Sequence, residues 1–415
     1  MLLVGNAARN TIAMVLAGGK GERLSPLTEH IPKPYLPFGG KYKIIDFVLS
    51  NLFNSGIKKV YILTQYHAYA LNKHIQESWS GWAGLGDFFD TISPETTSDR
   101  EEWFKGTADA IYQFIRFIES SDADYVAIFG GDHIYKMDIS QMLSYHVLNK
   151  ADMTLAGLQV PVEEAKRFGI FSVDEDYRVT DFTEKPANPV TIPDREDVCI
   201  ASMGNYVFST RKLIEILKEG KIHHDDLDFG KHIVPLMIKR GERVFAYNFS
   251  DNLIAGTRAE ERGYWKDVGT IDSYYDANMD LVNIVPQLNL YNYKWPILTK
   301  QGNLPPAKTL FDEEDRRGMN INSYVCGGCI TSGSTVRRSI IGPRCKINSF
   351  SVVEDSILFE NVEIGRYAKI KKAIISENIK IKEGMEIGYD HEEDRRRGFT
   401  VTDSGIVIVT KACPS

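Results

Sequence analysis

The stretch Ile12-Ala-Met-Val-Leu-Ala-Gly-Gly-Lys-Gly-Glu-Arg-Leu24 decides how this chain begins to fold. Its first part, Ile12–Ala17, is continuously apolar, which is typical of a strand buried on both faces. The glycines at positions 18, 19 and 21 follow, and they let backbone N–H groups approach an anion closely. Lys20 and Arg23 add positive charge to the same turn. The stretch therefore predicts a buried strand that ends in a phosphate-binding turn.

Two better-known glycine-rich motifs do not match this turn. The GxxxxGK[ST] spacing of a P-loop is absent, and Leu24 stands where the dinucleotide-binding fingerprint needs its third glycine. Because glycine-rich turns after strands are common, the turn alone is equally consistent with a plain tight turn and with a phosphate site. Lys33-Pro34 adds a second cation on a loop that proline stiffens, and this favours the phosphate site.

The order strand, helix, strand repeats from Thr11 to about Asn283. Apolar residues at helical spacing run from Ile45 to Phe53 and stop before Gly56, a typical helix C-cap. Thr107 is expected to cap a second helix, whose apolar face is formed by Ile111, Phe114, Ile115 and Ile118. The second and third strands are expected at Val60–Thr64 and Tyr125–Phe129. This alternation predicts βαβ units around a mostly parallel sheet.

A different period begins beyond Cys329. Aliphatic residues recur there every five or six positions, at Ile330, Val336, Ile341, Ile347, Val353, Leu358, Ile364, Ile370, Ile375, Ile381 and Ile387. This spacing predicts a parallel β-helix of the hexapeptide type, in which each side of a coil contributes one inward aliphatic residue. A sandwich of short strands has a similar composition but would seldom keep the period over such a length.

The two patterns are separated by a stretch of tyrosine, proline and charged residues that includes Leu304-Pro-Pro-Ala307. We therefore expect an N-terminal α/β domain at 1–288, a linker or docking segment at 289–320, and a β-helix domain at 321–415.

Composition narrows the class of protein. The chain has 415 residues, of which 43% are apolar and 25% charged, as expected for a folded protein of more than one domain. Its formal net charge of −7 argues against a broad nucleic-acid surface, so no nucleic-acid partner is expected. No apolar run approaches the roughly 20 residues that span a bilayer, and Met1–Asn10 lacks the features of a signal peptide. Neither a membrane partner nor export is expected.

The cysteines and histidines suggest no separate chemistry. The five cysteines are scattered and odd in number, which favours a reducing compartment and hence the cytoplasm: Cys199, Cys326, Cys329, Cys345 and Cys413. Cys326-Gly-Gly-Cys329 has the spacing of half a zinc site, but no second pair follows, so we favour a structural turn into the β-helix over a metal or redox site. The histidines show no pattern of a nucleophile or metal centre.

Two acidic residues are candidates for a metal site. Asp132 lies in Phe129-Gly-Gly-Asp-His-Ile-Tyr135, directly after the expected third strand, where open α/β sheets bind their ligands. Asp267, in Tyr264-Trp-Lys-Asp-Val-Gly269, could complete an oxygen-ligand Mg²⁺ site together with substrate phosphate. The alternative for Asp132 is an Asx turn or helix cap.

Two further motifs are weak on their own. Glu184-Lys185-Pro186 places an acid and a cation before a proline, and Ala201-Ser-Met-Gly204 opens another strand. A Glu-Lys pair is usually a solvated surface pair, and that interpretation would stand without further context.

Taken in order, these motifs resemble the bacterial glucose-1-phosphate adenylyltransferases, or ADP-glucose pyrophosphorylases. The resemblance rests on Leu16–Leu24, Lys33-Pro34, Gly39-Gly-Lys-Tyr-Lys-Ile-Ile-Asp-Phe47, Gly106-Thr-Ala-Asp-Ala110, Gly131-Asp-His-Ile-Tyr135, Glu184-Lys-Pro186, Ala201–Gly204 and Trp265-Lys-Asp-Val-Gly-Thr270. It runs from about residue 11 to the carboxyl terminus. The resemblance implies a Rossmann-like nucleotidyltransferase domain with a mostly parallel sheet, followed by a left-handed parallel β-helix. It also implies that the chain makes ADP-glucose and pyrophosphate from ATP and glucose 1-phosphate, the activated-glucose step of glycogen synthesis.

The resemblance assigns roles to individual residues. Lys20, Arg23 and Asp132 would be catalytic, Asp132 and Asp267 would bind Mg²⁺, and the nucleotide would lie against Gly18, Gly19, Gly21, Lys33 and Gly106. Glucose 1-phosphate would be held by Gly169, Glu184, Lys185 and Ser202, with the lysine on the phosphate and the acid on sugar hydroxyls. A homotetramer is implied, with a phosphorylated metabolite as effector and room for a paralogous regulatory subunit.

The sequence departs from the family at two places. Phe104 replaces a tyrosine found in many relatives, so a contact through that hydroxyl is absent. His30 stands where regulated relatives carry an activator-binding lysine, so His30 either contacts an anionic effector or only caps and packs its loop.

Two other classes of function are weighed against this one. A non-catalytic regulatory subunit should lack some ligand groups, but every position named above is filled. A bifunctional acyltransferase would need a histidine in the β-helix coils, and none occurs between Ile330 and Ile387.

Overall fold

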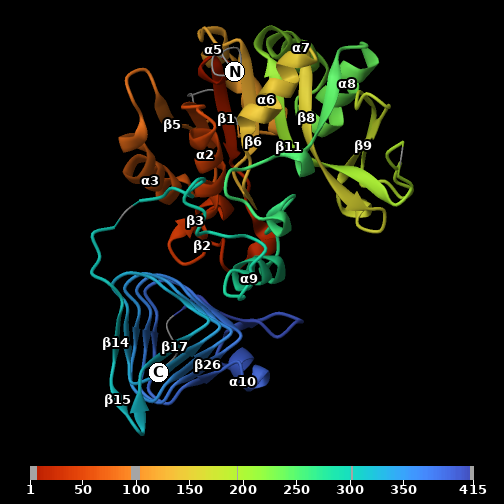
Figure 1. Ribbon diagram of the computed structural model, residues 1–415. Coiled ribbons are helices and arrows are strands. Elements are labelled where there is room, and N and C mark those ends of the chain that lie inside the picture. The colour runs from red at the N-terminus through yellow and green to blue at the C-terminus, as the bar shows by residue number, and fades with distance from the viewer. Residues whose placement is uncertain (1–6, 95–102, 194, 301, 412–415) are drawn as a thin grey trace.

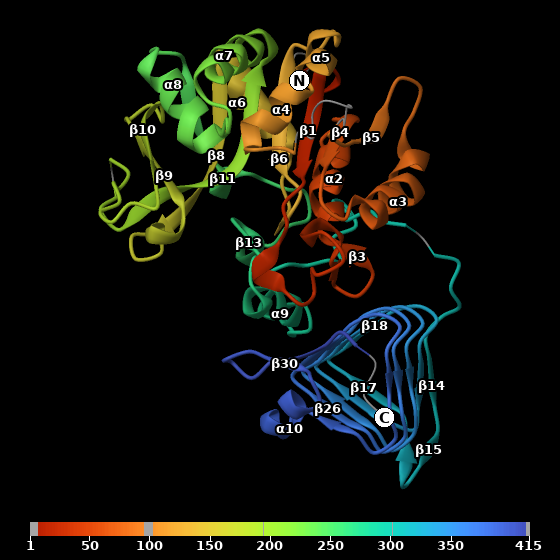
Figure 2. The ribbon, with the colours of Figure 1, turned by 180° about the vertical axis from the view of Figure 1, so that it is seen from behind.

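The computed structural model describes residues 7–94, 103–193, 195–300 and 302–411 (Figure 1). An α/β part and a β-helical part lie one above the other, and the opposite view shows the same two-part shape (Figure 2). Cys413 and the first six residues, which bear on the expectations for cysteines and for a signal peptide, lie outside the described residues. Among the described helices none is long and apolar enough to cross a bilayer.

The α/β part is built on a nine-stranded sheet with β10-β9-β11-β6-β1-β4-β5 as its main path. Strands β6, β1, β4 and β5 are parallel neighbours, whereas β11 runs antiparallel to β6, β8 and β9. The last strand, β12, pairs in parallel with β8. The strands are β1 (Thr11–Ala17), β4 (Lys59–Thr64), β5 (Phe88–Ile92), β6 (Tyr125–Gly130), β8 (Met153–Pro161), β9 (Gly169–Val173), β10 (Val179–Glu184), β11 (Val198–Ser209) and β12 (Val244–Asn248).

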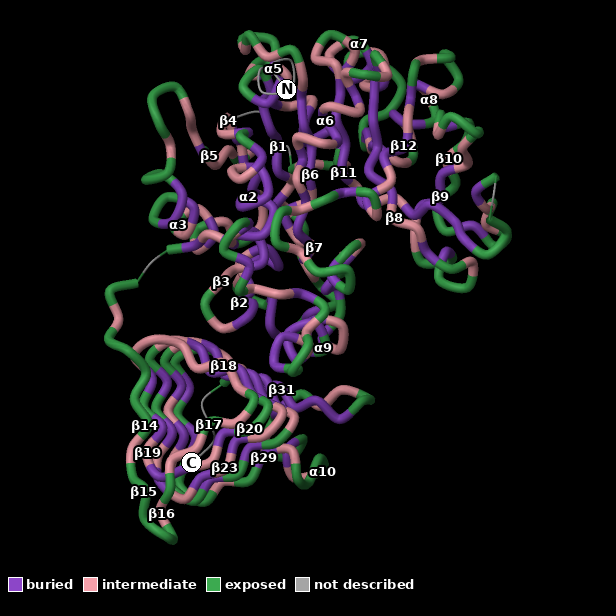
Figure 3. Tube along the Cα trace, viewed as in Figure 1, coloured by how far each residue is buried: buried purple, intermediate pink, exposed green. Residues whose placement is uncertain are grey.

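Alternating side chains of the central strands enter two separate cores. Ile12 and Met14 of β1 pack with one set of helices, and Ala13 and Val15 pack with the other. The first core contains α4 (Thr107–Gln113), α5 (Ile115–Glu119), α7 (Thr210–His223) and α8 (Val234–Lys239); the second contains α2 (Ile44–Asn54), α3 (Ala68–Trp79) and α6 (Ile139–Leu148). The buried strands therefore form a continuous layer between helices (Figure 3).

The expected helix after residue 106 differs in detail. Thr107 is its first residue and Gly106 is the N-cap, because the Thr107 hydroxyl donates instead to Asp228 Oδ2 at 2.9 Å. The helix is also broken at Phe114, whose φ of −109° and ψ of 20° end α4 before α5 begins. The helix predicted after Lys43 ends as expected near Gly56, which has a φ of +80°.

A small antiparallel pair of strands lies at the carboxyl end of the sheet. Strand β7 (His133–Tyr135) pairs with β13 (Trp265–Asp267), and His133 stands opposite Asp267. Helix α9 (Ile271–Asp280) follows β13 and is capped by Thr270, whose hydroxyl accepts from the Ser273 N–H. The hairpin β2 (Pro37–Phe38) and β3 (Tyr42–Lys43) precedes α2.

The C-terminal part is a parallel β-helix with three sheets, ordered β14-β19-β22-β25-β28, β17-β20-β23-β26-β29 and β18-β21-β24-β27-β31-β30. Ile347 pairs with Ile364 and that residue with Ile381, so one coil takes about 17 residues and supplies three inward positions. Its strands are β14 (Lys308–Leu310), β17 (Met319–Ile321), β18 (Tyr324–Val325), β19 (Ile330–Ser332), β20 (Thr335–Arg337), β21 (Ile340–Ile341), β22 (Lys346–Ile347), β23 (Val352–Glu354), β24 (Ile357–Leu358), β25 (Glu363–Ile364), β26 (Lys369–Lys371), β27 (Ala373–Ile375), β28 (Lys380–Ile381), β29 (Glu386–Ile387), β30 (Thr400–Val401) and β31 (Val407–Val409).

Two expectations for this part need correction. Ile330 points outward with 37% exposure, and Thr331 takes the inward place because it pairs with Ile347 and its hydroxyl bonds Asn320 Oδ1 at 3.1 Å. The first coil begins at Lys308, inside the segment expected as a linker, because its side chains are mostly solvated and give no apolar period. Beyond the last full coil, the charged run 390–398 contains helix α10 (His391–Arg396), which Asp390 caps by accepting from two backbone N–H groups.

The two parts share one apolar core. Tyr274 and Leu281, from α9 and the residue after it, belong to the same buried cluster as Ile340, Ile357 and Ile374 of the β-helix. The Tyr275 hydroxyl donates to the carbonyl of Asp355 at 2.5 Å, which ties α9 to a β-helix corner. Because α9 follows directly on β13, the β-helix braces the segment that carries Asp267.

Candidate active site

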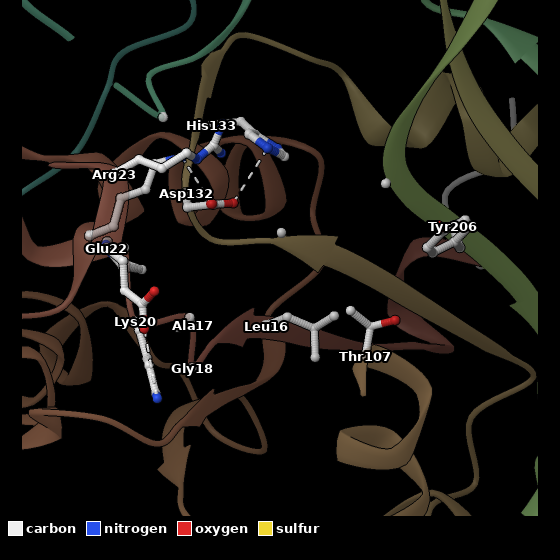
Figure 4. Close-up of a pocket in the computed structure, with 17 residues that line it drawn as sticks. Leu16, Ala17, Gly18, Lys20, Glu22, Arg23, Thr107, Asp132, His133 and Tyr206 are labelled. Carbon is white, nitrogen blue, oxygen red and sulfur yellow. Dashed lines mark hydrogen bonds and ion pairs between the residues drawn. The ribbon is translucent and has the colours of Figure 1, made fainter. Parts of the chain in front are cut away.

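A cavity of about 530 Å³ opens where β1 and β6 end at their carboxyl termini (Figure 4). Its lining includes the glycine-rich turn, Lys33, Asp132 and His133, together with Thr107 and Tyr206. In the close-up, Arg23, Asp132 and His133 gather at one side of the pocket, whereas Thr107 and Tyr206 lie at the other. The cavity is therefore at the edge of the sheet where open α/β folds bind ligands.

The glycine-rich turn has the backbone freedom that the sequence predicts. Gly21 has a φ of +65°, in the left-handed region that favours glycine, and its carbonyl accepts the Thr28 hydroxyl at 2.8 Å. A methyl group added at Gly19 would meet no atom within 4 Å, so the turn faces open space at that point. The backbone of the turn is thus held by Thr28 on one side and open towards the cavity on the other.

The two cations of the turn remain available to a ligand. Lys20 lies 3.8 Å from Glu22 and 5.1 Å from the centre of the Tyr66 ring, with just over half of its side chain exposed. Arg23 is still more exposed, and its Nη2 lies 3.9 Å from Asp267 Oδ2. Exposed contacts of this kind are weak, so both side chains can reorient towards phosphate.

Lys33 is placed differently from the other cations. Its Nζ lies 3.0 Å from Asp132 Oδ2 and 2.8 Å from Asp267 Oδ1, and the residue is only 5% exposed. It therefore bridges the two carboxylates that the sequence proposed as metal ligands. The pairing of β7 with β13 brings these acids together.

The electrostatics of this group favour the charged forms of both partners. Burial by itself would lower the pKa of Lys33, but Asp132 and Asp267 outweigh it and raise that pKa above its ordinary value. Burial by itself would raise the pKa of Asp132, but neighbouring His133 and the Lys33 ammonium lower it to about 2. The Asp132 carboxylate is thus held ionised, as a metal site requires.

The donor set fits Mg²⁺. Ligand atoms of Asp132, His133 and Asp267 lie within 4.8 Å of one another, and the two carboxylates supply the hard oxygen ligands that Mg²⁺ prefers. Each carboxylate keeps one oxygen that Lys33 does not bind.

The residues expected to hold glucose 1-phosphate form a second group beside the cavity. Gly169 of β9 stands opposite Glu184 of β10, and an added methyl group would come within 2.9 Å of Glu184 Oε2. Lys185 has a φ of +48° and lies 3.8 Å from Glu184, and both side chains are solvent-exposed. Ser202 lies on β11, which pairs with β9, and its hydroxyl accepts the Gly204 N–H at 3.2 Å.

Close packing of the backbone explains why residue 106 is a glycine. An added Cβ would lie 2.3 Å from the Leu227 carbonyl oxygen, so only glycine allows this close approach of two backbones. Phe104 lies behind the turn, because its ring is 3.5 Å from the Cβ that Gly18 would carry. Its backbone N–H donates to Gln65 Oε1 at 3.2 Å.

Comparison with known proteins identifies the family. The nucleotidyl transferase family model matches residues 12–284, and the model of the GlmU-like C-terminal hexapeptide matches 305–409. The glucose-1-phosphate adenylyltransferase of Geobacter metallireducens is 73% identical over 99% of this chain and 100% of its own length. The enzymes of the same name from Trichlorobacter lovleyi and Thermus thermophilus are 70% and 50% identical, over 98% and 96% of this chain and 98% of each relative.

The chain belongs to the glucose-1-phosphate adenylyltransferase family. The resemblance read from its motifs is confirmed, as are the nucleotidyltransferase fold with its mostly parallel sheet and the left-handed β-helix.

For a member of this family, the structure adds cavity residues that the motifs did not single out. Thr107 and Tyr206 line the cavity, and His133 lies 3.4 Å from Asp132 through Nε2. His133 Nδ1 and Trp265 Nε1 are buried and have no hydrogen-bond partner among the described residues. The position of His133 beside Asp132 was visible in the sequence, but Tyr206 carried no signal beyond its strand.

The remaining sequence candidates lie outside this cavity. His30 is exposed on the loop between the turn and Lys33. Cys329 donates to the Gly342 carbonyl at 3.0 Å within the β-helix, and no metal-binding group containing a cysteine is found among the described residues. His74, on α3, donates from Nε2 to Asp46 Oδ1 of α2 over 2.7 Å and so links these two helices away from the cavity.

Proposed function

We infer that the chain transfers the adenylyl group of ATP to α-D-glucose 1-phosphate, giving ADP-glucose and pyrophosphate. This is the activated-glucose step of glycogen synthesis. The observation that carries the inference is the full-length identity with enzymes of that name, in a chain whose glycine-rich turn and acid pair converge on one cavity.

The reaction needs positioning and charge neutralisation more than proton transfer. The phosphate oxygen of glucose 1-phosphate attacks the α-phosphorus of ATP in line with the departing pyrophosphate. That oxygen is already anionic near neutral pH, so no general base is required. Lys20 and Arg23 are exposed beside the turn and can follow the charge that develops on the leaving group.

We propose Asp132 and Asp267 as the residues that hold Mg²⁺. Bound there, the ion would neutralise phosphate oxygens and help to orient them. The chain itself prepares the site, because the Lys33 ammonium binds both acids and keeps them close together before substrate arrives.

The two substrates would occupy opposite sides of the turn. ATP would lie against Gly18, Gly19 and Gly21, with its base near Gly106. Glucose 1-phosphate would lie at the second group. Lys185 would pair with its phosphate and Glu184 with its hydroxyls, and Gly169 and Ser202 would also contact it. Tyr206, on β11 with Ser202, lines the cavity and so lies between the two groups.

A steady-state experiment tests the function directly. The purified chain should form nucleotide sugar from ATP and glucose 1-phosphate far faster than from UTP or dTTP. Asp132→Asn should lower kcat at least about a hundredfold in saturating Mg²⁺, and Asp267→Asn should do the same, because each removes a charge that binds the ion. Asp403→Asn, an exposed acid of the β-helix, serves as the control. Near-wild-type kcat in both site variants would disprove the metal assignment.

Assembly, regulation and location are also proposed. A β-helix has open ends and edges that a neighbouring subunit can cover, so we propose a homotetramer, with a paralogous regulatory subunit as an alternative partner. Sedimentation of a stable monomer at micromolar concentration would contradict this. A phosphorylated metabolite is the proposed effector, with His30 as a contact. The unpaired Cys199, Cys326, Cys329 and Cys345 support a cytoplasmic location.

A further inference from the structure

In the cavity, each carboxylate oxygen of Asp132 and Asp267 already has a nitrogen atom nearby. Lys33 Nζ lies on Asp132 Oδ2 and Asp267 Oδ1 at 3.0 and 2.8 Å. The other oxygens face His133 Nε2 at 3.4 Å and Arg23 Nη2 at 3.9 Å. Every oxygen of the pair therefore has a nitrogen within 4 Å, and a metal ion must displace one of these contacts.

Lys33 is the contact that cannot leave easily. Arg23 is exposed, whereas the Lys33 side chain is buried, and within the described residues its ammonium contacts only the two acids. The Lys33 backbone lies in a short helical turn, Lys33–Tyr35, that Pro34 stiffens. Tyr35 is packed edge-on against His74 at 5.9 Å between ring centres, which anchors this turn to α3.

The Lys33 side chain also packs against the glycine-rich turn at Gly21. A Cβ added at Gly21 would lie 3.1 Å from Lys33 Cβ, so the aliphatic stem of the lysine supports the turn. The same side chain is therefore in contact with the element that receives phosphate and with the acids that receive the metal.

The charges around the pair cancel. Two carboxylates are balanced by the Lys33 ammonium and the Arg23 guanidinium, so a free divalent cation meets no net negative charge there. A triphosphate changes this balance, because it brings several negative charges that can attract both cations and the metal.

We propose that Lys33 is a counter-ion gate, which keeps free divalent metal off Asp132 and Asp267 until nucleotide phosphates draw its ammonium away. Metal binding thereby becomes conditional on nucleotide, while the acids stay paired with the Lys33 ammonium in the absence of metal. This inference rests on the proposed metal site of the transferase reaction.

The test is direct titration of Mn²⁺, as a probe for Mg²⁺, followed by electron paramagnetic resonance of the free ion. Without nucleotide, wild type should bind Mn²⁺ weakly, and Lys33→Met should bind it at least about tenfold more tightly. Lys33→Arg keeps the charge and should stay weak. Lys136→Met removes another buried lysine, whose Nζ donates to the Asn289 carbonyl and not to either acid of the pair, and should behave as wild type.

A second experiment tests the proposed metal site independently of the proposed role of Lys33. With α,β-methylene-ATP, which cannot transfer its adenylyl group, wild type should bind Mn²⁺ tightly, and Asp132→Asn should weaken that binding. If the aspartate variant weakens it but Lys33→Met leaves nucleotide-free binding unchanged, the gate is wrong and the metal site stands. If the aspartate variant has no effect, the metal site itself fails.

One further result is independent of whether Lys33→Met folds. Tight Mn²⁺ binding to the wild type without nucleotide, in the micromolar range, would overturn the gate by itself. Should Lys33→Met not fold, Lys33→Gln keeps a polar end of similar length and provides the same comparison.

Discussion

His146 provides a sharp test of the electrostatics of the α/β core. It lies in α6 with 1% exposure, and its two ring nitrogens contact Thr154 Oγ1 at 2.9 Å and Ser209 Oγ at 3.2 Å. The Ser209 hydroxyl donates to the Ala151 carbonyl, so its oxygen accepts from His146 Nε2–H, and Nδ1 accepts from Thr154. This network satisfies the neutral imidazole and leaves no acceptor for a second proton.

Protonation of His146 should therefore oppose folding. Burial lowers the pKa of His146 from 6.5 to about 4 in the folded protein. Between these two values the unfolded chain binds a proton that the folded chain does not. The stability that His146 contributes is complete above about pH 6.5 and is lost as the pH falls towards 4. At about 1.4 kcal/mol per pKa unit, the loss amounts to roughly 3 kcal/mol.

The assay compares the free energy of unfolding by urea, followed by tryptophan fluorescence, at several values between pH 7.5 and pH 4. His146→Gln keeps hydrogen-bonding capacity but cannot titrate, so its stability should fall less than that of wild type by about that amount. His223→Gln, an exposed position at the end of α7, is the matched control and should follow wild type. Parallel curves for wild type and His146→Gln would refute the reasoning.

Three other outcomes are expected. Lys185→Ala should raise KM for glucose 1-phosphate much more than it lowers kcat, because the charge pairs with phosphate already in the ground state; a rise in KM for ATP instead would assign Lys185 to the other substrate. Gly388→Ala should cost at least about 2 kcal/mol of stability, since its φ is +82° and the new Cβ would meet the Lys371 carbonyl at 1.8 Å. Gly384→Ala, with φ +70° and open space around it, should cost less in the same denaturation assay. His30→Lys should strengthen activation by a sugar bisphosphate at pH 8, because a lysine is charged there, and unchanged activation would exclude an anion contact at this position.

Local sequence patterns were sufficient to predict single strands and the repeated coils of the β-helix. The apolar run before Gly18 is β1, and the aliphatic period is the β-helix, because neighbouring coils repeat the same inward positions. The period failed at Ile330, where the coil starts one residue out of step and a polar Thr331 is inside. Burial of a threonine depends on its partner Asn320, which the period does not include.

Helix capping cannot be predicted from residue type alone, because a capping side chain can also bind groups from distant parts of the chain. Thr107 has the right residue type for an N-cap, yet its hydroxyl bonds Asp228, which comes from a distant loop. The charged run after Tyr389 lacks an apolar face, yet Asp390 and the pairs of Glu393 with Arg396 and Arg397 stabilise α10.

By itself, the sequence determined the glycine-rich turn after the first strand, the order of the two kinds of fold along the chain and the family to which the motifs belong. Each of these depends on residues close together in the chain or repeated at a fixed interval. The tertiary structure alone decided that Asp132 and Asp267 meet and that the Lys33 ammonium lies between their carboxylates. The reason is that this contact requires β7 to pair with β13, and both the strand pairing and the burial of Lys33 arise only when segments distant in the chain pack together.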